Sequence, residues 1–406
     1  MQGQALTINK PKTVYQILFI IGTVHLLNDS ISALIPAMFP ILEQSLGLSF
    51  TQLGLIAFAA NMTSSVMQPL VGWFTDQRPS PYALPAGLCF TLVGIVGLAL
   101  SPSFWLVIIS VAFIGIGGAI FHPEGSRVAY MASGGRRGFA QSIYQVGGNA
   151  GQALGPIITA LLLVPLGQDG ALWFTIVAAM AVILLFYIAR WYGEQLPAQS
   201  MNRLKKQHTS SKRLSLNYRL IYVMGLLVFL VFARSWYRTA ILNFYTFFTI
   251  EEYNFTIQHA ELYIFVFMAA AALGTFIGGP IADKIGKRNV ILLSIAGAAP
   301  LSILLPHVGP VLALPLLILT GLILLANVSV SVVYAQELLP GNIGTASGLI
   351  VGLGFGLGAI GSIVIGRFAD LFGIASTMTA ASFLPLLGLL ALLLPSDSQL
   401  EKWQHS

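Results

Sequence analysis

The sequence predicts an all-α membrane protein in which twelve transmembrane helices form two pseudo-symmetric six-helix bundles. Three observations predict this fold class. Only 8% of the 406 residues are charged and 56% are hydrophobic, whereas about a quarter of the residues of an average soluble domain are charged. Apolar stretches recur along the whole chain, and the two halves of the chain repeat each other. This composition excludes a secreted domain, a cytosolic enzyme and a disordered chain.

A helix that crosses a bilayer needs about 20 mainly apolar residues, and twelve stretches of the chain meet this requirement. The first stretch follows Lys10 and Lys12 but lacks a small-residue cleavage site, so we expect it to be retained as a helix. The single cysteine, Cys89, has no partner, so no disulfide is expected. The predicted spans are residues 14–40, 51–74, 83–101, 104–131, 139–165, 171–193, 218–249, 258–282, 289–306, 311–338, 344–370 and 374–394.

The basic residues are distributed asymmetrically between the two sides of these spans. With the N-terminus inside, 17 lysines and arginines fall on the cytoplasmic side and only Arg367 falls on the other. Positive residues collect on the cytoplasmic side of membrane proteins. The net charge of +6 therefore indicates topology and attraction to anionic headgroups rather than a nucleic-acid partner. We expect a multi-pass protein of the bacterial inner membrane with both termini in the cytoplasm. The acids expected on the outer side are Glu43, Asp169, Glu251, Glu252 and Glu261.

The two halves of the chain repeat each other with a constant offset of 207 residues. This offset relates Asp76 to Asp283, and it relates the glycines of segment 147–155 to segment 354–362. Duplicated bundles of this kind are the parallel repeats of secondary transporters. We therefore predict an N-terminal bundle (1–193), a polar cytoplasmic linker (194–217) and a C-terminal bundle (218–406).

Several motifs resemble the major facilitator superfamily. The stretch GPIADKIGKR at 279–288 is similar to its signature loop between the second and third spans of one half, and residues 72–78 keep a degraded copy. The glycines and proline of 151–156 resemble the span 5 motif of drug-exporting antiporters, and Glu337-Leu-Leu-Pro340 is typical of the superfamily. More narrowly, the strings at 25–29, 121–129 and 334–341 resemble the fosmidomycin resistance protein family. This resemblance implies export of phosphonate antibiotics of the fosmidomycin type.

Asp29 lies near the middle of the first span, with His25 one turn earlier and Asn28 beside it. Because a carboxylate is costly in a bilayer, we expect Asp29 to face a wet cavity and to be protonated for part of a cycle, with His25 as its partner in proton coupling. The alternative is a buried acid that only hydrogen-bonds to a neighbouring helix, with His25 as a packing residue. Asn28 is a candidate substrate contact.

Glu124 and Arg127 are spaced i,i+3 in the fourth span and follow His122 and Pro123. Side chains at this spacing can pair. They form either an internal ion pair beside a proline-loosened turn, or a proton-coupling switch in which Glu124, with His122 nearby, takes up a proton and releases Arg127 to the substrate. No metal or other cofactor is expected, because His122 and Glu124 face different sides of a helix and a third ligand is missing.

Arg234 and Arg238 lie one turn apart in the seventh span, with Tyr237 between them. The span contains no acid, so we expect both arginines to face an anion, which is either a protein carboxylate or a substrate. We predict that Arg234 approaches Asp29 across the pseudo-twofold axis. Arg238 either binds phosphate-like oxygens or extends to the outer interface. Further candidate substrate contacts are Tyr237 and the fifth-span amides Gln145 and Asn149.

The cytoplasmic helix ends predict a conformational latch rather than a substrate site. Carboxylates at these ends can cap helix N-termini, and basic residues can pair with acids. We expect Glu337 to pair with Lys287 or Arg288 and so to close the inner side. The predicted latch residues are Gly72, Asp76, Arg78, Gly279, Asp283, Lys287, Arg288 and Glu337.

Together these features predict a monomeric transporter that exports a small anionic compound in exchange for protons by alternating access. The sequence has no Walker A loop, so an ion gradient rather than ATP is expected to drive it. The nearest alternative is a proton symporter that imports an organic or phosphorylated anion through the same cavity. The repeat and the latch disfavour an anion channel. A membrane enzyme is disfavoured because neither a nucleophile–base set nor a metal triad is apparent.

Overall fold

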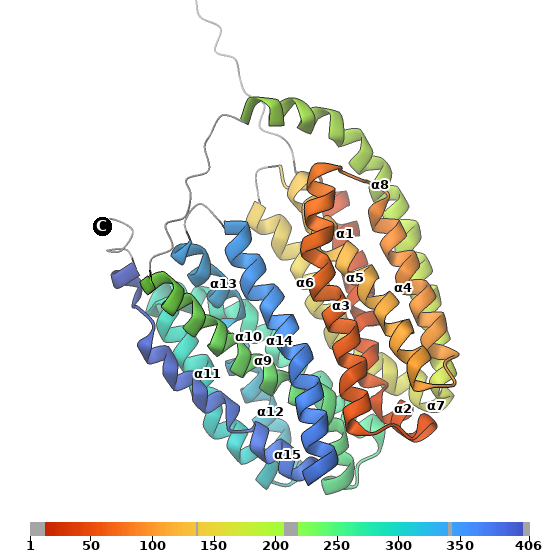
Figure 1. The fold of residues 1–406 in the computed structure, drawn as a ribbon, viewed down its shortest axis with the longest axis vertical. Coiled ribbons are helices and arrows are strands. Elements are labelled where there is room, and N and C mark those ends of the chain that lie inside the picture. The colour runs from red at the N-terminus through yellow and green to blue at the C-terminus, as the bar shows by residue number, and fades with distance from the viewer. Residues whose placement is uncertain (1–12, 135–136, 207–217, 340–342, 401–406) are drawn as a thin grey trace, which may run out of the picture.

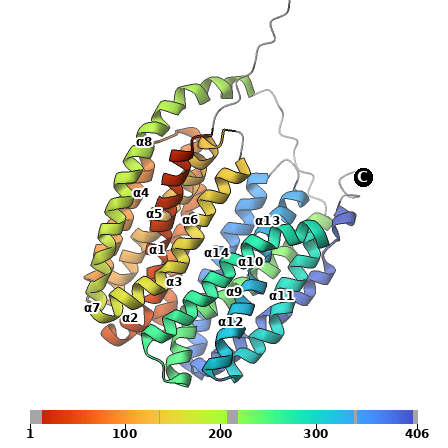
Figure 2. The same ribbon diagram turned by 180° about the vertical axis from the view of Figure 1, so that it is seen from behind.

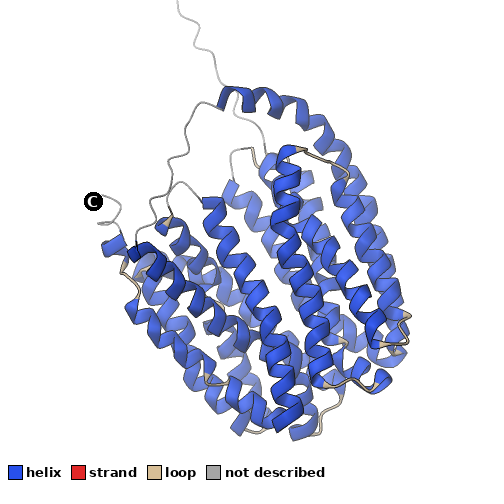
Figure 3. Cartoon of the chain, viewed as in Figure 1, coloured by secondary structure: helices blue, strands red, loops and turns tan. Residues whose placement is uncertain are grey.

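The computed structural model describes residues 13–134, 137–206, 218–339 and 343–400. Within these ranges the regular secondary structure is helical and no strand is present (Figure 3). Most of the helices run side by side along one direction (Figure 1), which is the arrangement that satisfies backbone hydrogen bonds inside a membrane. Ten stretches of the described chain are long and apolar enough to cross a membrane, and the apolar helix Ala83–Ala99 is shorter. The all-α membrane fold class is confirmed.

The helices before the linker pack together as an N-terminal bundle. In this bundle α1 packs along α6, while α3 and α4 pack against α5. We call the end of the molecule at which α8 ends and α9 begins the linker face, and the end that carries α2 the opposite face (Figure 1). The elements are α1 (Tyr15–Ala37), α2 (Phe39–Leu46), α3 (Phe50–Gln77), α4 (Ala83–Ala99), α5 (Phe104–Ala132), α6 (Arg137–Ile158), η1 (Thr159–Leu163), α7 (Val164–Leu166), η2 (Gln168–Leu172) and α8 (Trp173–Lys206).

The helices after the linker pack together as a C-terminal bundle. Here α10 packs against α12, α14 against α9, and α11 against η4. The elements are α9 (Tyr218–Tyr253), α10 (Ile257–Ile285), α11 (Lys287–Leu304), η3 (Leu305–His307), α12 (Pro310–Leu324), α13 (Asn327–Leu338), α14 (Ile343–Phe372), α15 (Ile374–Ala381) and η4 (Leu384–Leu393).

The structure corrects several predicted helix boundaries. The first predicted span ends earlier, with α1 at Ala37, and the twelfth consists of α15 and the 3₁₀ helix η4. The helix α8 continues through the first part of the predicted linker as far as Lys206, because polar residues with good helix propensity extend a helix beyond the bilayer. The tenth predicted span is two helices, since α12 ends at Leu324 and α13 begins at Asn327. The rest of the predicted linker, 207–217, lies outside the described residues.

One hydrophobic core is shared by both bundles, and two further cores each belong to a single bundle. The shared core joins Leu34 and Ile56 of the N-terminal bundle to Phe244, Phe248 and Ile365 of the C-terminal bundle, in the half of the molecule near the opposite face. The separate cores occupy the half near the linker face. Apolar packing therefore joins the bundles at the opposite face, whereas near the linker face each bundle packs on itself.

Two pairs of helices carry the contact between the bundles. The helices α3 and α14 lie side by side in Figure 1, and α6 packs against α10 on the other side of the molecule (Figure 2). Glycines permit the close approach of α3 and α14. A Cβ atom on Gly54 would overlap the carbonyl group of Ser362, and one on Gly366 would overlap that of Phe50. Even an alanine at either position would force these two helices apart.

Candidate functional site

The cluster around Asp29 is built on a close contact between α1 and α6. Gly147 and Gly151 of α6 lie against the carbonyl groups of Gly22 and Leu26, and a Cβ at either glycine would overlap them. Small residues at such positions let two helix backbones approach closely. This close contact brings the polar residue Gln152 of α6 next to Asp29.

Both carboxylate oxygens of Asp29 have polar partners, although the residue is almost completely buried. The Asn28 amide donates to Oδ1 at 3.0 Å, and the Gln152 amide donates to Oδ2 at 2.9 Å. The Nε2 atom of His25 lies 3.5 Å from Oδ2, and that of His122 lies 3.9 Å from Oδ1. The structure therefore brings Asp29, His25 and Asn28 together with His122, which the sequence analysis had associated with Glu124.

The ring of His25 is held between α1, α5 and α6. Its Nδ1 atom lies 2.7 Å from the backbone carbonyl oxygen of Tyr144, and its ring stacks on the Tyr144 ring with centroids 4.0 Å apart. On another side it contacts Phe121, with ring centroids 5.5 Å apart. A Cβ on Gly148 would lie about 2.5 Å from Nε2 of His25, so the imidazole fits only because residue 148 has no side chain.

The cluster extends from the N-terminal bundle to α9 of the C-terminal bundle through one amide group. Gln152 donates to Asp29 and accepts a hydrogen bond from Nη2 of Arg238 at 3.2 Å. The sequence analysis expected Arg234, rather than Arg238, to approach Asp29. In the structure Arg234 instead donates to the Asn327 side chain of α13. Arg234 and Arg238 lie one turn apart along α9. The turn of α9 that contacts α6 is the one that carries Arg238.

The two arginines of α9 form an uncompensated pair of positive charges. Arg234 is 7% exposed, and the two guanidinium groups are close enough to interact electrostatically. Among the side chains that the structure describes, neither arginine has a carboxylate within ion-pair distance. Tyr237 lies between them in the sequence and is buried. Its hydroxyl has no hydrogen-bond partner in the described part of the chain. Buried arginines normally face an anion, and their planar donors suit carboxylate and phosphate groups.

The other predicted substrate contacts lie on or near the same helices. On α6, the Gln145 side chain is exposed and Asn149 is half-buried. Both are on the same helix as Gln152, which was not among the predicted site residues. No described contact joins Arg127 to the arginines of α9. Arg127 instead contacts Glu124 and Thr75 within the N-terminal bundle.

Glu124 and Arg127 form an ion pair inside the N-terminal bundle. The Nη2 atom of Arg127 lies 3.5 Å from Oε1 of the fully buried Glu124, and the Tyr192 hydroxyl donates to Oε2 at 3.2 Å. Arg127 also donates to the backbone oxygen of Thr75 at 2.7 Å. The group links α5 to α3 and α8. This arrangement matches the internal ion pair that the sequence predicted, and it leaves the protonation switch as a proposal.

His25, Asp29 and His122 also form a group of three side chains that offer metal ligand atoms, all within 4.8 Å of one another. A zinc ion would need its ligand atoms about 2 Å from a common centre. The carboxylate oxygens of Asp29 already accept hydrogen bonds from two amides, and the nitrogen–oxygen separations of 3.5 and 3.9 Å leave room for protons on the imidazoles. The donor set fits a proton-binding site better than a metal site.

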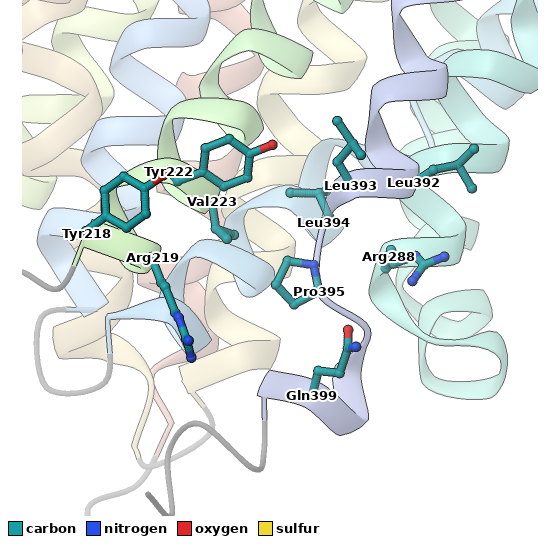
Figure 4. Close-up of a pocket in the computed structure, with 10 residues that line it drawn as sticks. All are labelled: Tyr218, Arg219, Tyr222, Val223, Arg288, Leu392, Leu393, Leu394, Pro395 and Gln399. Carbon is teal, nitrogen blue, oxygen red and sulfur yellow. The ribbon is translucent and has the colours of Figure 1, made fainter.

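One of the contacts predicted for the latch is an ion pair within the C-terminal bundle. Lys287 Nζ lies 2.9 Å from Glu337 Oε1 and 3.5 Å from Asp397 Oδ2, so Glu337 pairs with Lys287, as one of the two alternatives expected. Arg288 instead lines a hollow of about 450 Å³ at the linker face, together with Arg219 and Gln399 (Figure 4). The side chains of Asp76 and Asp283 lie outside the part of the chain whose side chains the structure describes. Gly72, Arg78 and Gly279 are at helix ends on the linker face.

Two acids that the sequence analysis left out of the site have defined partners near the opposite face. Glu261, expected on the outer side at the start of the predicted span 258–282, is a residue of α10 that is only 1% exposed and accepts a hydrogen bond from Thr246 at 3.2 Å. Asp370 at the end of α14 accepts hydrogen bonds from the backbone nitrogens of Phe50 and Thr51, each at 2.8 Å.

Comparison with known proteins agrees with this architecture. The family model described as Major Facilitator Superfamily matches residues 18–361. The chain is 58% identical over 401 residues to a Bacillus subtilis (strain 168) protein named uncharacterized MFS-type transporter YfnC, with 98% of each chain covered. It is 43% identical over 395 residues to the fosmidomycin resistance protein of Escherichia coli (strain K12), covering 97% of this chain and 96% of the relative.

Solved structures share the fold at low sequence identity. The nucleoside transporter NupG aligns with a TM-score of 0.73 at 13% identity and covers 93% of this chain and 98% of its own. A bacterial homologue of the lysosomal transporter Spinster, in an inward-facing and occupied conformation, aligns with a TM-score of 0.73 at 16% identity, covering 94% of this chain and 96% of its own. The chain belongs to the major facilitator superfamily, and it is a multi-pass membrane transporter rather than an enzyme.

Proposed function

We propose that the protein is a proton-coupled secondary transporter that exports a small anionic compound by alternating access. Phosphonate antibiotics of the fosmidomycin type are the substrates to test first, since the 43% identical relative is named a fosmidomycin resistance protein. The observation that carries the proposal is the pair of arginines on α9, the buried Arg234 and the half-buried Arg238, which no described carboxylate neutralises. A substrate with two or three acceptor oxygens would supply the missing negative charge.

The positive-inside pattern supports a cytoplasmic location for the linker face and for both termini. On that assignment the bundles share a core on the outer side and pack separately on the inner side. The site around Asp29 and Arg238 would then receive substrate from the cytoplasm in this state. Export follows when the outer contacts between α3 and α14 separate while the inner helix ends close, which is a rocking of one bundle against the other.

Coupling to protons needs an acid whose protonation changes with substrate loading. Asp29 alone would give the wrong sign for exchange, because its protonation leaves the arginines free for the anion and so favours joint binding of proton and anion. We propose that Glu124 supplies the opposite linkage. Glu124 is fully buried. Among the described residues, Arg127 is its ion-pair partner and the Tyr192 hydroxyl donates a hydrogen bond to it. Loss of its proton as substrate loads would complete an exchange cycle.

One observation favours the alternative function, a proton symporter that imports an organic or phosphorylated anion. The Gln152 amide connects Asp29 directly to Arg238, so the proton-binding and anion-binding groups interact through a single side chain. Such a connection favours cooperative binding of the two ligands. The sign of the coupling between proton and anion therefore distinguishes the two functions.

The test uses purified protein in vesicles with an imposed pH difference. We expect labelled fosmidomycin to accumulate in vesicles whose interior is acidic, because protons then leave as the anion enters. Arg234→Gln should abolish accumulation, whereas Arg190→Gln, which changes an exposed arginine of α8, should not. Accumulation driven by an acidic exterior would show symport instead. Equal movement with and without the pH difference would refute proton coupling.

A further inference from the structure

The environment of His25 determines where protons can reside on its ring. A backbone carbonyl oxygen only accepts hydrogen bonds, so the contact of 2.7 Å between Nδ1 of His25 and the carbonyl oxygen of Tyr144 requires a proton on Nδ1. In a neutral imidazole the other nitrogen then has no proton and presents a lone pair. That nitrogen, Nε2, faces the Asp29 carboxylate at 3.5 Å. Two lone pairs facing each other in a buried site repel.

A second proton removes this conflict, and it can reside on either partner. The hydrogen bonds of Asp29 decide between them. Both of its oxygens accept from amide N–H groups, those of Asn28 and Gln152, and hydrogen bonds of this kind stabilise the ionised form of a carboxyl group. We propose that His25 is the proton-binding group of this cluster, held as an imidazolium between the Tyr144 carbonyl and the Asp29 carboxylate. This inference deepens the proposed function and rests on it only in linking this proton to transport.

The groups that face this pair from other helices fit the same assignment. His122 of α5 lies with its Nε2 3.9 Å from Asp29 Oδ1, where a neutral ring can direct an N–H group toward the carboxylate. Tyr144 of α6 stacks on the imidazole through its ring. Arg238 of α9 reaches the cluster only through Gln152. The imidazolium is therefore the positive charge in direct contact with Asp29 Oδ2 among the described residues.

The assignment gives the pair a definite response to proton loss. Once Nε2 loses its proton, Asp29 is an ion without its compensating charge, and the nearest remaining positive group is Arg238 beyond Gln152. The carboxylate and an anionic substrate would then compete for Arg238. Tyr144 acts in this scheme through its backbone carbonyl, which fixes the tautomer, and Gly148 acts by leaving room for the ring. Both are positioning residues.

The direct test is nitrogen NMR on the full-length protein in lipid bilayers with ¹⁵N-labelled histidine. The chain has 6 histidines, and His25→Asn identifies the signals of His25. At neutral pH we expect both ring nitrogens of His25 to be protonated in the wild type. In Asp29→Asn, whose amide can donate to Nε2, we expect loss of the Nε2 proton while Nδ1 stays protonated. The signals of the exposed His259 serve as the control for folding.

The outcomes separate this inference from the proposed function. A neutral His25 in the wild type, or a charged His122 in its place, would overturn the assignment even if vesicles show proton-driven transport. An imidazolium at residue 25 in a protein that shows no proton-driven transport would support the site and refute the proposed function. One equivalent of Zn²⁺ that shifts the ring signals of both His25 and His122 would identify the cluster as a metal site and overturn the assignment.

Discussion

The contact of Asp370 with the start of α3 predicts how the two bundles exchange between states. The Asp370 carboxylate accepts hydrogen bonds from the backbone nitrogens of Phe50 and Thr51, each at 2.8 Å, and one from the Thr51 hydroxyl. These residues begin a helix of the N-terminal bundle, whereas Asp370 is near the end of α14 in the C-terminal bundle. A carboxylate at a helix N-terminus interacts favourably with the helix dipole, so this contact stabilises the closed opposite face.

Replacing Asp370 with asparagine removes the negative charge and leaves one acceptor oxygen. Loss of one hydrogen bond to a backbone N–H group costs about 0.5–1.5 kcal/mol, and loss of the charge near the helix N-terminus costs about 0.3–1 kcal/mol. Because the site is exposed, solvent screening reduces both contributions. We expect Asp370→Asn to destabilise this state by about 1 kcal/mol, which is roughly a fivefold shift toward a state with the opposite face open.

The shift is measured as a distance across the opposite face. Spin labels at Gln44 and Glu252, both exposed and in different bundles, report the separation by double electron–electron resonance in a Cys89→Ser background. The matched control is Thr256→Val. The Thr256 side chain caps the N-terminus of α10 by accepting from the His259 backbone nitrogen at 3.4 Å, within one bundle. A similar shift in both variants, or none in Asp370→Asn, would refute the reasoning.

Four further predictions concern coupling, binding, turnover and topology. Arg234→Ala should weaken binding of the anion at least tenfold in equilibrium binding assays, because a charged hydrogen bond contributes about 1.5–3 kcal/mol. Glu124→Gln should retain binding but lose proton-driven export in vesicles. Asp283→Asn should slow turnover and leave equilibrium binding largely intact, since it alters the balance of states. Cysteines at Lys205 and Glu252 should react with impermeant reagents from opposite sides of the membrane, and labelling of both from outside would contradict the topology.

Helix positions could be predicted from the sequence because the bilayer imposes both length and hydrophobicity. The fourth span was expected at 104–131, and α5 is Phe104–Ala132. Hydropathy does not report a break in a hydrogen-bonded helix, so the division between α12 and α13 was missed. It also does not report where a helix continues in water, so the extension of α8 to Lys206 was missed.

The local part of the site was predictable, whereas the contacts between bundles were not. His25 and Asp29 are spaced i,i+4 on one helix, and their contact follows from that spacing. The link from Gln152 to Arg238 depends on how α6 and α9 are placed relative to each other, and a shift of one turn along α9 separates the observed contact from the predicted contact of Arg234 with Asp29. Glu261 lies in the span that was predicted for it, but its contact with Thr246 of α9 depends on how α9 and α10 pack and was not predictable from hydropathy.

The arrangement of charges determines the sign of coupling at each site. The proton on His25 compensates the negative charge of Asp29. Arg238, which interacts with Asp29 through Gln152, is then available to bind the anion. A proton at His25 therefore promotes anion binding, which by itself produces symport. Exchange requires that anion binding release a larger proton fraction at a second site than it takes up at His25, and Glu124 is the described buried acid of the N-terminal bundle that lies outside the His25 cluster. If both assignments hold, Glu124→Gln retains only the linkage at His25. Such a variant should carry anion and proton in the same direction, and the sign of its pH-driven accumulation in vesicles would be the reverse of that of the wild type.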